Sequence, residues 1–104
     1  MIRIEEILRG IEVVSQTGDS TTSVSGIEFD SRNVISGSLF VAVKGFKTDG
    51  HDYINAAVRS GAVAVICETV PENPDKKTCW IKTSDSAKAL GLAASNFFNN
   101  PSAS

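Results

Sequence analysis

Several features that mark particular classes of protein are absent from this sequence of 104 residues. It has no basic run, and its ten basic and twelve acidic residues give a net charge of −2. The electrostatic footprint of a general nucleic-acid binder is therefore missing. No apolar run approaches the roughly 20 residues needed to span a bilayer, and the amino-terminal segment carries glutamates where a secretory signal would be apolar. We therefore expect neither nucleic acid nor a membrane as a partner.

Residues that bind metals or form disulfides are also few. The chain has two cysteines, Cys67 and Cys79, and one histidine, His51. The two thiols lack a Cys-x-x-Cys spacing, and with a single histidine they make a poor metal site. We expect no metal site here, and we expect two reduced, largely buried thiols in a cytoplasmic protein.

What the chain does contain is typical of one globular domain covering residues 1–104. Hydrophobic residues make up 41% and charged residues 21% of the sequence, which argues against disorder. Two continuous apolar runs, residues 39–43 and 62–67, predict strands that are covered on both faces. Helices are predicted at about 52–60 and from Ser84 onward. The expected fold is therefore α/β, with a small mixed β-sheet flanked by helices.

The first third of the chain predicts shorter elements. Periodic isoleucines indicate an amphipathic helix over residues 2–9, which Gly10 ends. A short strand at 12–16 and an irregular strand at 24–29 follow, the second with Gly26 as a bulge.

The last third predicts a strand and a helix. A polar loop at 68–77 leads into a short strand at 78–81, and Ser84 is the expected N-cap of the final helix. A boundary at Asn99-Asn100-Pro101, close to the last residue, indicates a domain cut from something longer. The expected apolar face of the final helix comprises Ala87, Leu90, Ala94, Phe97 and Phe98.

Candidate functional residues flank the predicted strand at 39–43. Asp30-Ser31-Arg32 precede it, and Lys47-Thr48-Asp49-Gly50-His51 follow it. One interpretation is architectural: Asp30 or Ser31 caps backbone amides, Asp49 or Asp52 caps the following helix, and Arg32 forms a surface ion pair. The other is a site for a phosphate or a polar ring, because a hydroxyl, a guanidinium fork and a helix start all suit an anion.

No catalytic group can be assigned from these residues. His51 has no partner that the sequence identifies, and no serine or cysteine can be assigned to it as a nucleophile. The P-loop form G-x-x-x-x-G-K-[ST] does not occur, and paired acids for glycosidic chemistry are unsupported. On its residues alone, the chain is predicted to be a ligand-binding α/β domain without identifiable catalytic residues.

The order of these motifs is more specific than any one of them. Asp-Ser-Arg at 30–32, Gly-x-Leu-Phe-Val-Ala at 37–42, Gly-x-x-x-Asp-Gly-His-x-Tyr-Ile at 45–54 and Ala-x-x-x-Gly-Ala-x-Ala at 57–64 follow one another. In this order they resemble the N-terminal domain of the Mur ligases, the ATP-dependent amide-forming enzymes of peptidoglycan precursor synthesis. Phe97-Phe98-Asn99-Asn100-Pro101-Ser102 is similar to the segment that joins that domain to the central ATPase domain. Within the family, the resemblance is greatest to ligases that add the third amino acid, meso-diaminopimelate or L-lysine.

The resemblance implies that this domain holds the UDP end of UDP-N-acetylmuramoyl-L-alanyl-D-glutamate, the UDP-N-acetylmuramoyl-dipeptide substrate. It also implies that ATP and Mg²⁺ bind the central and C-terminal domains of a bacterial, cytoplasmic parent enzyme, so this chain alone should bind no cofactor and be inactive. Phe46 departs from the polar residue of some members, which places any side-chain hydrogen bond there in doubt. The implied substrate-binding residues are Phe29, Ser31, Arg32, Phe46, Lys47, Thr48, Asp49, Gly50 and His51.

Other functions remain open at this point. The D-alanyl-D-alanine-adding ligase has a similar N-terminal domain. A free-standing nucleotide-sugar binding module and a purely structural or interaction domain are the further alternatives.

Overall fold

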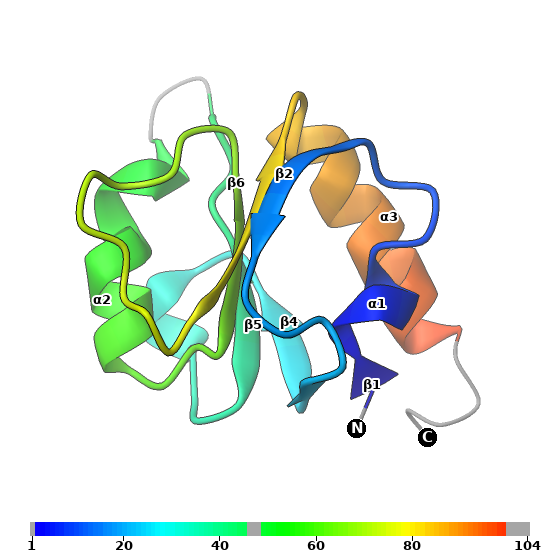
Figure 1. Cartoon of the computed structure of the whole chain (residues 1–104), viewed down its shortest axis with the longest axis horizontal. Helices are drawn as coiled ribbons and strands as arrows, with labels where there is room; N and C mark the ends of the chain where they lie inside the picture. Colours follow the sequence, from blue (N-terminus) through cyan, green and yellow to red (C-terminus); the bar gives the residue numbers. More distant parts are fainter. Residues whose placement is uncertain (1, 46–48, 100–104) are drawn as a thin grey trace.

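A computed structural model describes residues 2–45 and 49–99 of the chain. Two layers of helix enclose a central sheet, with α2 on one side and α1 and α3 on the other (Figure 1). The elements are β1 (Ile2–Arg3), α1 (Ile4–Ile7), β2 (Val13–Thr17), β3 (Ser23–Val24), β4 (Gly26–Glu28), η1 (Ser31–Asn33), β5 (Ser38–Val41), η2 (Gly50–Tyr53), α2 (Ile54–Arg59), β6 (Ala64–Cys67), β7 (Cys79–Thr83) and α3 (Ser86–Phe98).

The main sheet has five strands in the order β2-β7-β6-β5-β4. Strands β4 to β7 are parallel, and β2 pairs with β7 in the antiparallel sense. Phe40 of β5 lies between Glu28 of β4 and Val65 of β6, so this apolar strand is an inner strand of the sheet. The predicted α/β class with a small mixed sheet is confirmed.

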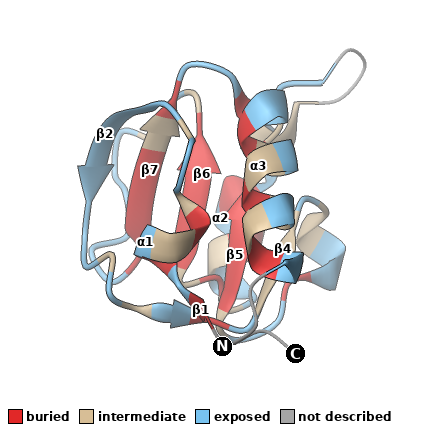
Figure 2. Ribbon diagram, turned by 90° about the vertical axis from the view of Figure 1, so that its right-hand side faces the viewer, coloured by how far each residue is buried: buried red, intermediate tan, exposed pale blue. Residues whose placement is uncertain are grey.

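The inner strands are buried on both faces because their side chains alternate between two cores. Leu39 and Val41 pack with the isoleucines of α1 and the inner face of α3. Phe40 and Ala42 pack with Ile54 and the rest of α2. Figure 2 shows β5, β6 and β7 buried while β2, at the edge, is exposed. The predicted double coverage of the apolar runs is therefore confirmed.

The two cysteines lie on neighbouring strands but in different cores. Cys79 belongs to the core under α3, and Cys67 belongs to the core under α2. Both are free and buried, as expected. Burial raises the pKa of the Cys67 thiol to about 11, so it is held as the neutral thiol.

Two predictions for the first third of the chain are wrong. The expected helix at 2–9 is reduced to α1, because residues 2–3 form β1 and pair with β3. The expected single strand at 24–29 is split between two sheets at Ser25, whose amide donates to the Gly37 carbonyl instead. Gly26 is not a bulge, since it pairs in regular register with Ser38.

The start of the last helix also differs from the prediction. Asp85 is the N-cap, not Ser84, and its carboxylate accepts a hydrogen bond from the Lys88 amide. Ser86 is held by Glu68, which sets the rotation of α3. Phe97 is buried as expected, but Ala87 and Phe98 are exposed, and Ala89 and Ala93 are buried in their place. Alanines are too small and too numerous in this helix for their spacing to define its inner face.

The predicted helix at 52–60 is confirmed as α2, with the 3₁₀ turn η2 in front of it. Asp49 caps that turn by accepting from the His51 amide, as the architectural interpretation expected. Among the described helices, none is both long and apolar enough to cross a bilayer.

Candidate functional site

A pocket of about 540 Å³ opens where β4 and β5 end. Parallel strands deliver their carboxyl ends to one edge of a sheet, which is where ligands bind in open α/β folds. Its volume lies in the range of small-molecule sites, roughly 300–1,000 Å³. The residues after β4, those after β5 and the first and last residues of η2 form its wall: Phe29, Asp30, Ser31, Arg32, Val43, Gly45, Gly50 and Tyr53.

Asp30 and Arg32, which both line this pocket, form a two-pronged ion pair. Arg32 Nε donates to Asp30 Oδ1 at 3.1 Å, and Nη2 donates to Oδ2 at 2.8 Å. The Arg32 amide also donates to Asp30 Oδ1 at 3.0 Å, so Asp30 caps η1. The architectural interpretation of Asp30-Ser31-Arg32 is thus confirmed, and it places the guanidinium in a fixed plane at the pocket edge.

The electrostatics of the pocket follow from this pair. Hydrogen bonds from the Arg32 side chain and amide lower the pKa of Asp30 from 3.8 to about 2. The same contact raises the pKa of Arg32. The Arg32 side chain is 86% exposed, and the pair uses two of the five N–H donors that a guanidinium carries. Its other N–H groups form no hydrogen bond within the described residues and can donate to a ligand.

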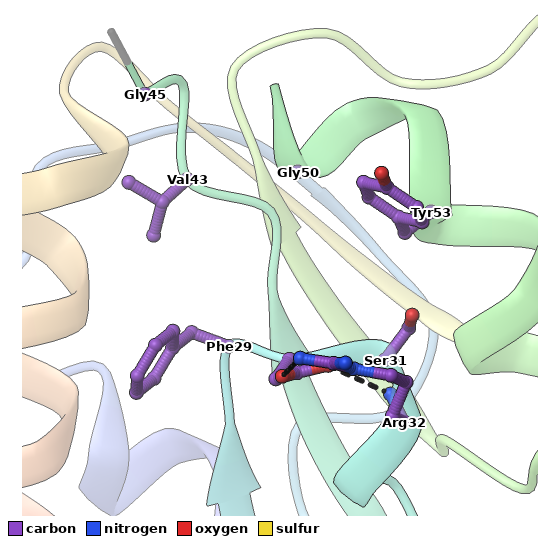
Figure 3. Close-up of a pocket in the computed structure, with 8 residues that line it drawn as sticks. Phe29, Ser31, Arg32, Val43, Gly45, Gly50 and Tyr53 are labelled. Carbon is purple, nitrogen blue, oxygen red and sulfur yellow. Dashed lines mark hydrogen bonds and ion pairs between the residues drawn. The ribbon is translucent and has the colours of Figure 1, made fainter. Parts of the chain in front are cut away.

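Aromatic side chains stand on two sides of the pocket. Phe29 is 65% exposed and Tyr53 is 46% exposed, although large aromatic residues are usually buried. Figure 3 shows Phe29 and Val43 on one side and Tyr53 on the other, with the Ser31 hydroxyl on the Tyr53 side. This arrangement offers apolar faces to a planar ring and hydroxyl and guanidinium donors to an anion.

Gly50 allows the chain after β5 to return against the strand it has just left. Its amide donates to the Val43 carbonyl at 2.8 Å. A Cβ atom on Gly50 would lie 2.7 Å from the Val43 nitrogen and 3.1 Å from the Ala42 Cα. Only glycine permits this close approach of the two backbone segments. Gly50 and Val43 thereby form one wall of the pocket.

His51 is not among the residues that line the pocket, and its ring makes hydrogen bonds elsewhere in the chain. Its Nδ1 lies 2.6 Å from Asp49 Oδ1, and its Nε2 accepts from the Glu68 amide at 2.9 Å. Because the Glu68 N–H is a donor, Nε2 carries no proton, and Nδ1–H donates to Asp49. The partner that His51 lacked in the sequence is therefore Asp49, two residues before it.

The structure brings together part of the predicted site. Phe29, Ser31, Arg32 and Gly50 line one pocket. Asp49 and His51 adjoin it but are not among the residues that line it. Phe46, Lys47 and Thr48 lie outside the residues that the structure describes.

Sequence reasoning missed part of the wall, namely Asp30, Val43, Gly45 and Tyr53. Asp30 and Gly45 lie inside the quoted motifs, but the implied substrate-binding residues did not include them. Tyr53 could have been found, because it follows Gly50 by three residues and a helical turn returns such a side chain to the same side. Val43, the last residue of an apolar run, gave no signal.

Comparison with known proteins identifies the family. Residues 23–98 match the Mur ligase family, catalytic domain. The chain belongs to the Mur ligase family. The family inferred from the ordered motifs is therefore confirmed, and the fold described above is that of a Mur ligase N-terminal domain.

Relatives in bacteria match nearly the whole chain. It is 44% identical over 98 residues to the UDP-N-acetylmuramoyl-L-alanyl-D-glutamate–2,6-diaminopimelate ligase of Bacteroides thetaiotaomicron, covering 94% of this chain and 20% of that protein. It is 36% identical over 102 residues to the ligase of the same name from Clostridioides difficile, covering 97% of this chain and 20% of that protein. The chain thus spans about one fifth of the length of these Mur ligases.

Solved Mur ligase structures share the fold. The UDP-N-acetylmuramoylalanyl-D-glutamyl-2,6-diaminopimelate–D-alanyl-D-alanyl ligase of Acinetobacter baumannii superposes with a TM-score of 0.74 at 22% identity, over 88% of this chain and 20% of that one. MurF ligase from Thermotoga maritima, solved in complex with ADP, superposes with a TM-score of 0.56 at 35% identity, over 74% of this chain and 17% of that one.

Proposed function

We propose that this chain is the substrate-anchoring domain of an ATP-dependent ligase of peptidoglycan precursor synthesis. In this proposal it holds the UDP end of UDP-N-acetylmuramoyl-L-alanyl-D-glutamate, and other domains add the third amino acid in the bacterial cytoplasm. The observation that carries the proposal is the pocket at the ends of β4 and β5, where Ser31, Arg32 and two exposed aromatic faces meet. The similarity to diaminopimelate ligases over nearly all of the chain supports it.

The pocket chemistry suits a nucleoside diphosphate. Phe29 and Tyr53 offer faces on which a planar base can pack. The Ser31 hydroxyl and the N–H groups of Arg32 that Asp30 does not occupy are donors for phosphate oxygens. Phe46, Lys47, Thr48, Asp49 and His51 stay a prediction as direct substrate contacts. Binding energy from the UDP end would orient the distant carboxylate that the ligase activates.

The described residues offer no site that fits ATP or Mg²⁺. The sequence has no P-loop. No three His, Cys, Asp or Glu side chains gather into a possible metal site within residues 2–45 and 49–99. We therefore assign both groups to central and C-terminal domains of a longer protein, and no step of the reaction to this chain.

A second candidate is the equivalent domain of the D-alanyl-D-alanine-adding ligase. The 35% identity to MurF ligase from Thermotoga maritima favours it over part of the chain. The 44% identity to diaminopimelate ligases extends over more of the chain and favours the first candidate. Assaying the full-length protein with UDP-N-acetylmuramoyl-dipeptide and UDP-N-acetylmuramoyl-tripeptide distinguishes the two, since each ligase extends only one of them.

The site assignment is tested by Ser31→Ala and Arg32→Ala in the full-length protein. We expect each to raise KM for the UDP-N-acetylmuramoyl-dipeptide by roughly tenfold, because a hydrogen bond to a charged group contributes about 1.5–3 kcal/mol. Arg9→Ala is the matched control, since Arg9 is exposed and does not line the pocket. An unchanged KM in both pocket variants would refute the assignment. A free-standing binding module would instead be indicated by a stop codon directly after Ser104.

A further inference from the structure

A closed ring of hydrogen bonds lies beside the pocket and joins three segments that are distant in sequence. The Lys44 amide donates to Ser86 Oγ at 2.9 Å, and that hydroxyl donates to Glu68 Oε2 at 2.6 Å. The Glu68 amide donates to His51 Nε2 at 2.9 Å, and the imidazole contacts Asp49 Oδ1 at 2.6 Å. Asp49 and Lys44 complete the ring as an antiparallel β-bridge.

Within the described residues, no buried side-chain nitrogen or oxygen of the ring lacks a hydrogen-bond partner. The fully buried Ser86 hydroxyl both donates and accepts, and the Ser86 amide adds a second hydrogen bond to Glu68 Oε2 at 3.0 Å. These two contacts lower the pKa of Glu68, which holds the carboxylate in its ionised, accepting form. The His51 side chain is 15% exposed and has one tautomer compatible with its neighbours. A polar network in which every member is satisfied rigidifies the segments it connects.

The ring is placed where it can shape the pocket. Lys44 and Asp49 form the base of the turn between β5 and η2. The pocket residues Val43, Gly45 and Gly50 are the chain neighbours of these two residues. Ser86 and Glu68 are anchored to the body of the fold through α3 and β6, and neither lines the pocket. The ring therefore links α3 to one wall of the pocket, so the position of that wall depends on the position of α3.

We propose that Ser86, Glu68 and His51 are positioning residues for the UDP site, which act by clamping the base of the turn after β5. This inference rests on the proposed function, because it names what holds that same pocket in its binding geometry. It replaces the direct substrate contact predicted for His51 with an indirect role, since both of its ring nitrogens are engaged within the chain. A preorganised wall gives tighter binding because less ordering is required when the ligand arrives.

Ser86→Ala and Thr83→Val in the full-length protein form the central comparison. Each removes one buried hydroxyl, but Thr83 Oγ1 donates to the Glu12 carbonyl at 3.0 Å and forms no hydrogen bond to Lys44 or Asp49. We expect Ser86→Ala to raise both the UDP Kd and the KM for UDP-N-acetylmuramoyl-dipeptide by roughly fivefold to tenfold, with kcat changed less than about twofold. Thr83→Val should leave the UDP Kd within about twofold of the original protein at a similar loss of thermal stability.

His51 supplies a second test that does not disturb the core. Gln can present an oxygen near the position of His51 Nε2 and accept from the Glu68 amide, whereas Leu cannot. We expect His51→Leu to raise the UDP Kd as Ser86→Ala does, and His51→Gln to recover at least half of that loss. If Ser86→Ala fails to fold, this pair carries the test alone.

The outcomes distinguish failure of the clamp from failure of the proposed UDP-binding function. Equal UDP Kd values for Ser86→Ala and Thr83→Val, or for His51→Gln and His51→Leu, would overturn the clamp while leaving the proposed function intact. If the unmodified full-length protein binds neither UDP nor the UDP-N-acetylmuramoyl-dipeptide, the proposed function itself fails. The clamp then loses its role in binding as well.

Discussion

At the scale of single residues, the pair of Asp30 and Arg32 shows how two surface charges acquire a fixed geometry. The aspartate accepts from the arginine side chain and from its amide at the same time. Exposed ion pairs contribute little to stability on their own, because solvent screens them and long side chains lose freedom. Here the pair is better understood as fixing the direction of the guanidinium than as stabilising the fold.

This geometry predicts a specific acid sensitivity. The pKa of Asp30 is lowered from 3.8 to about 2. Its ionised form therefore contributes fully to the stability of the folded state above about pH 4, and this contribution is lost as the pH falls through about 2. A carboxyl ¹³C titration by NMR should give the low midpoint, and Arg32→Ala should return it toward 3.8. A midpoint near 3.8 in the unmodified protein would contradict the hydrogen-bonded pair.

At the scale of elements, the pocket depends on how η2 lies against the end of β5. The start of η2 touches the strand backbone through Gly50, and Asp49 caps the turn by accepting from the His51 amide. The aspartates at the starts of η1 and η2 have the same role, since each accepts a backbone amide two residues on. The two 3₁₀ turns η1 and η2 are thus capped in the same way, and they present pocket residues from the ends of neighbouring strands.

Gly50→Ala is expected to disturb this contact. The new Cβ would lie 2.7 Å from the Val43 nitrogen, and relieving such a clash in packed backbone costs roughly 1–3 kcal/mol. Gly26→Ala is the matched control, because no atom lies within 4 Å of a Cβ there. Urea unfolding of both variants measures the difference. Equal free energies of unfolding would show that η2 can move away from β5 without cost.

At the scale of the whole molecule, one sheet separates two cores. Leu39 and Phe40, adjacent in sequence, enter opposite cores, and the same alternation continues through β6 and β7. Neither core exists without the strands that it shares with the other. The two layers of helix are therefore expected to unfold together.

Phe40→Ala tests that coupling. Phe40 is fully buried in the core under α2, and removing a buried phenylalanine side chain costs roughly 3–5 kcal/mol. We expect the fluorescence of Trp80, which reports on that core, to change at the same urea concentration as far-UV circular dichroism. The shared midpoint should fall in the variant. Separate midpoints would mean that the α3 side of the sheet is stable alone.

Much of this fold was determined by local patterns in the sequence. Continuous apolar runs identified β5 and β6 as inner strands, because a strand covered on both faces has no need of polar alternation. The polar, glycine-containing segments beside them identified the ends of those strands as the candidate site. The order of the motifs identified the family. The first two conclusions depend on residues close together in the chain, and the third depends on the order of such short segments.

Only the tertiary structure decided which side chains meet. The parallel register of β4 and β5 brings Ser31 and Arg32 to the same pocket as Tyr53. Packing of α3 against β6 joins Ser86 to Glu68 and, through His51 and Lys44, to the turn after β5. Such contacts depend on strand register and helix rotation, which are set by the sum of all packing contacts. No short segment of sequence contains that information.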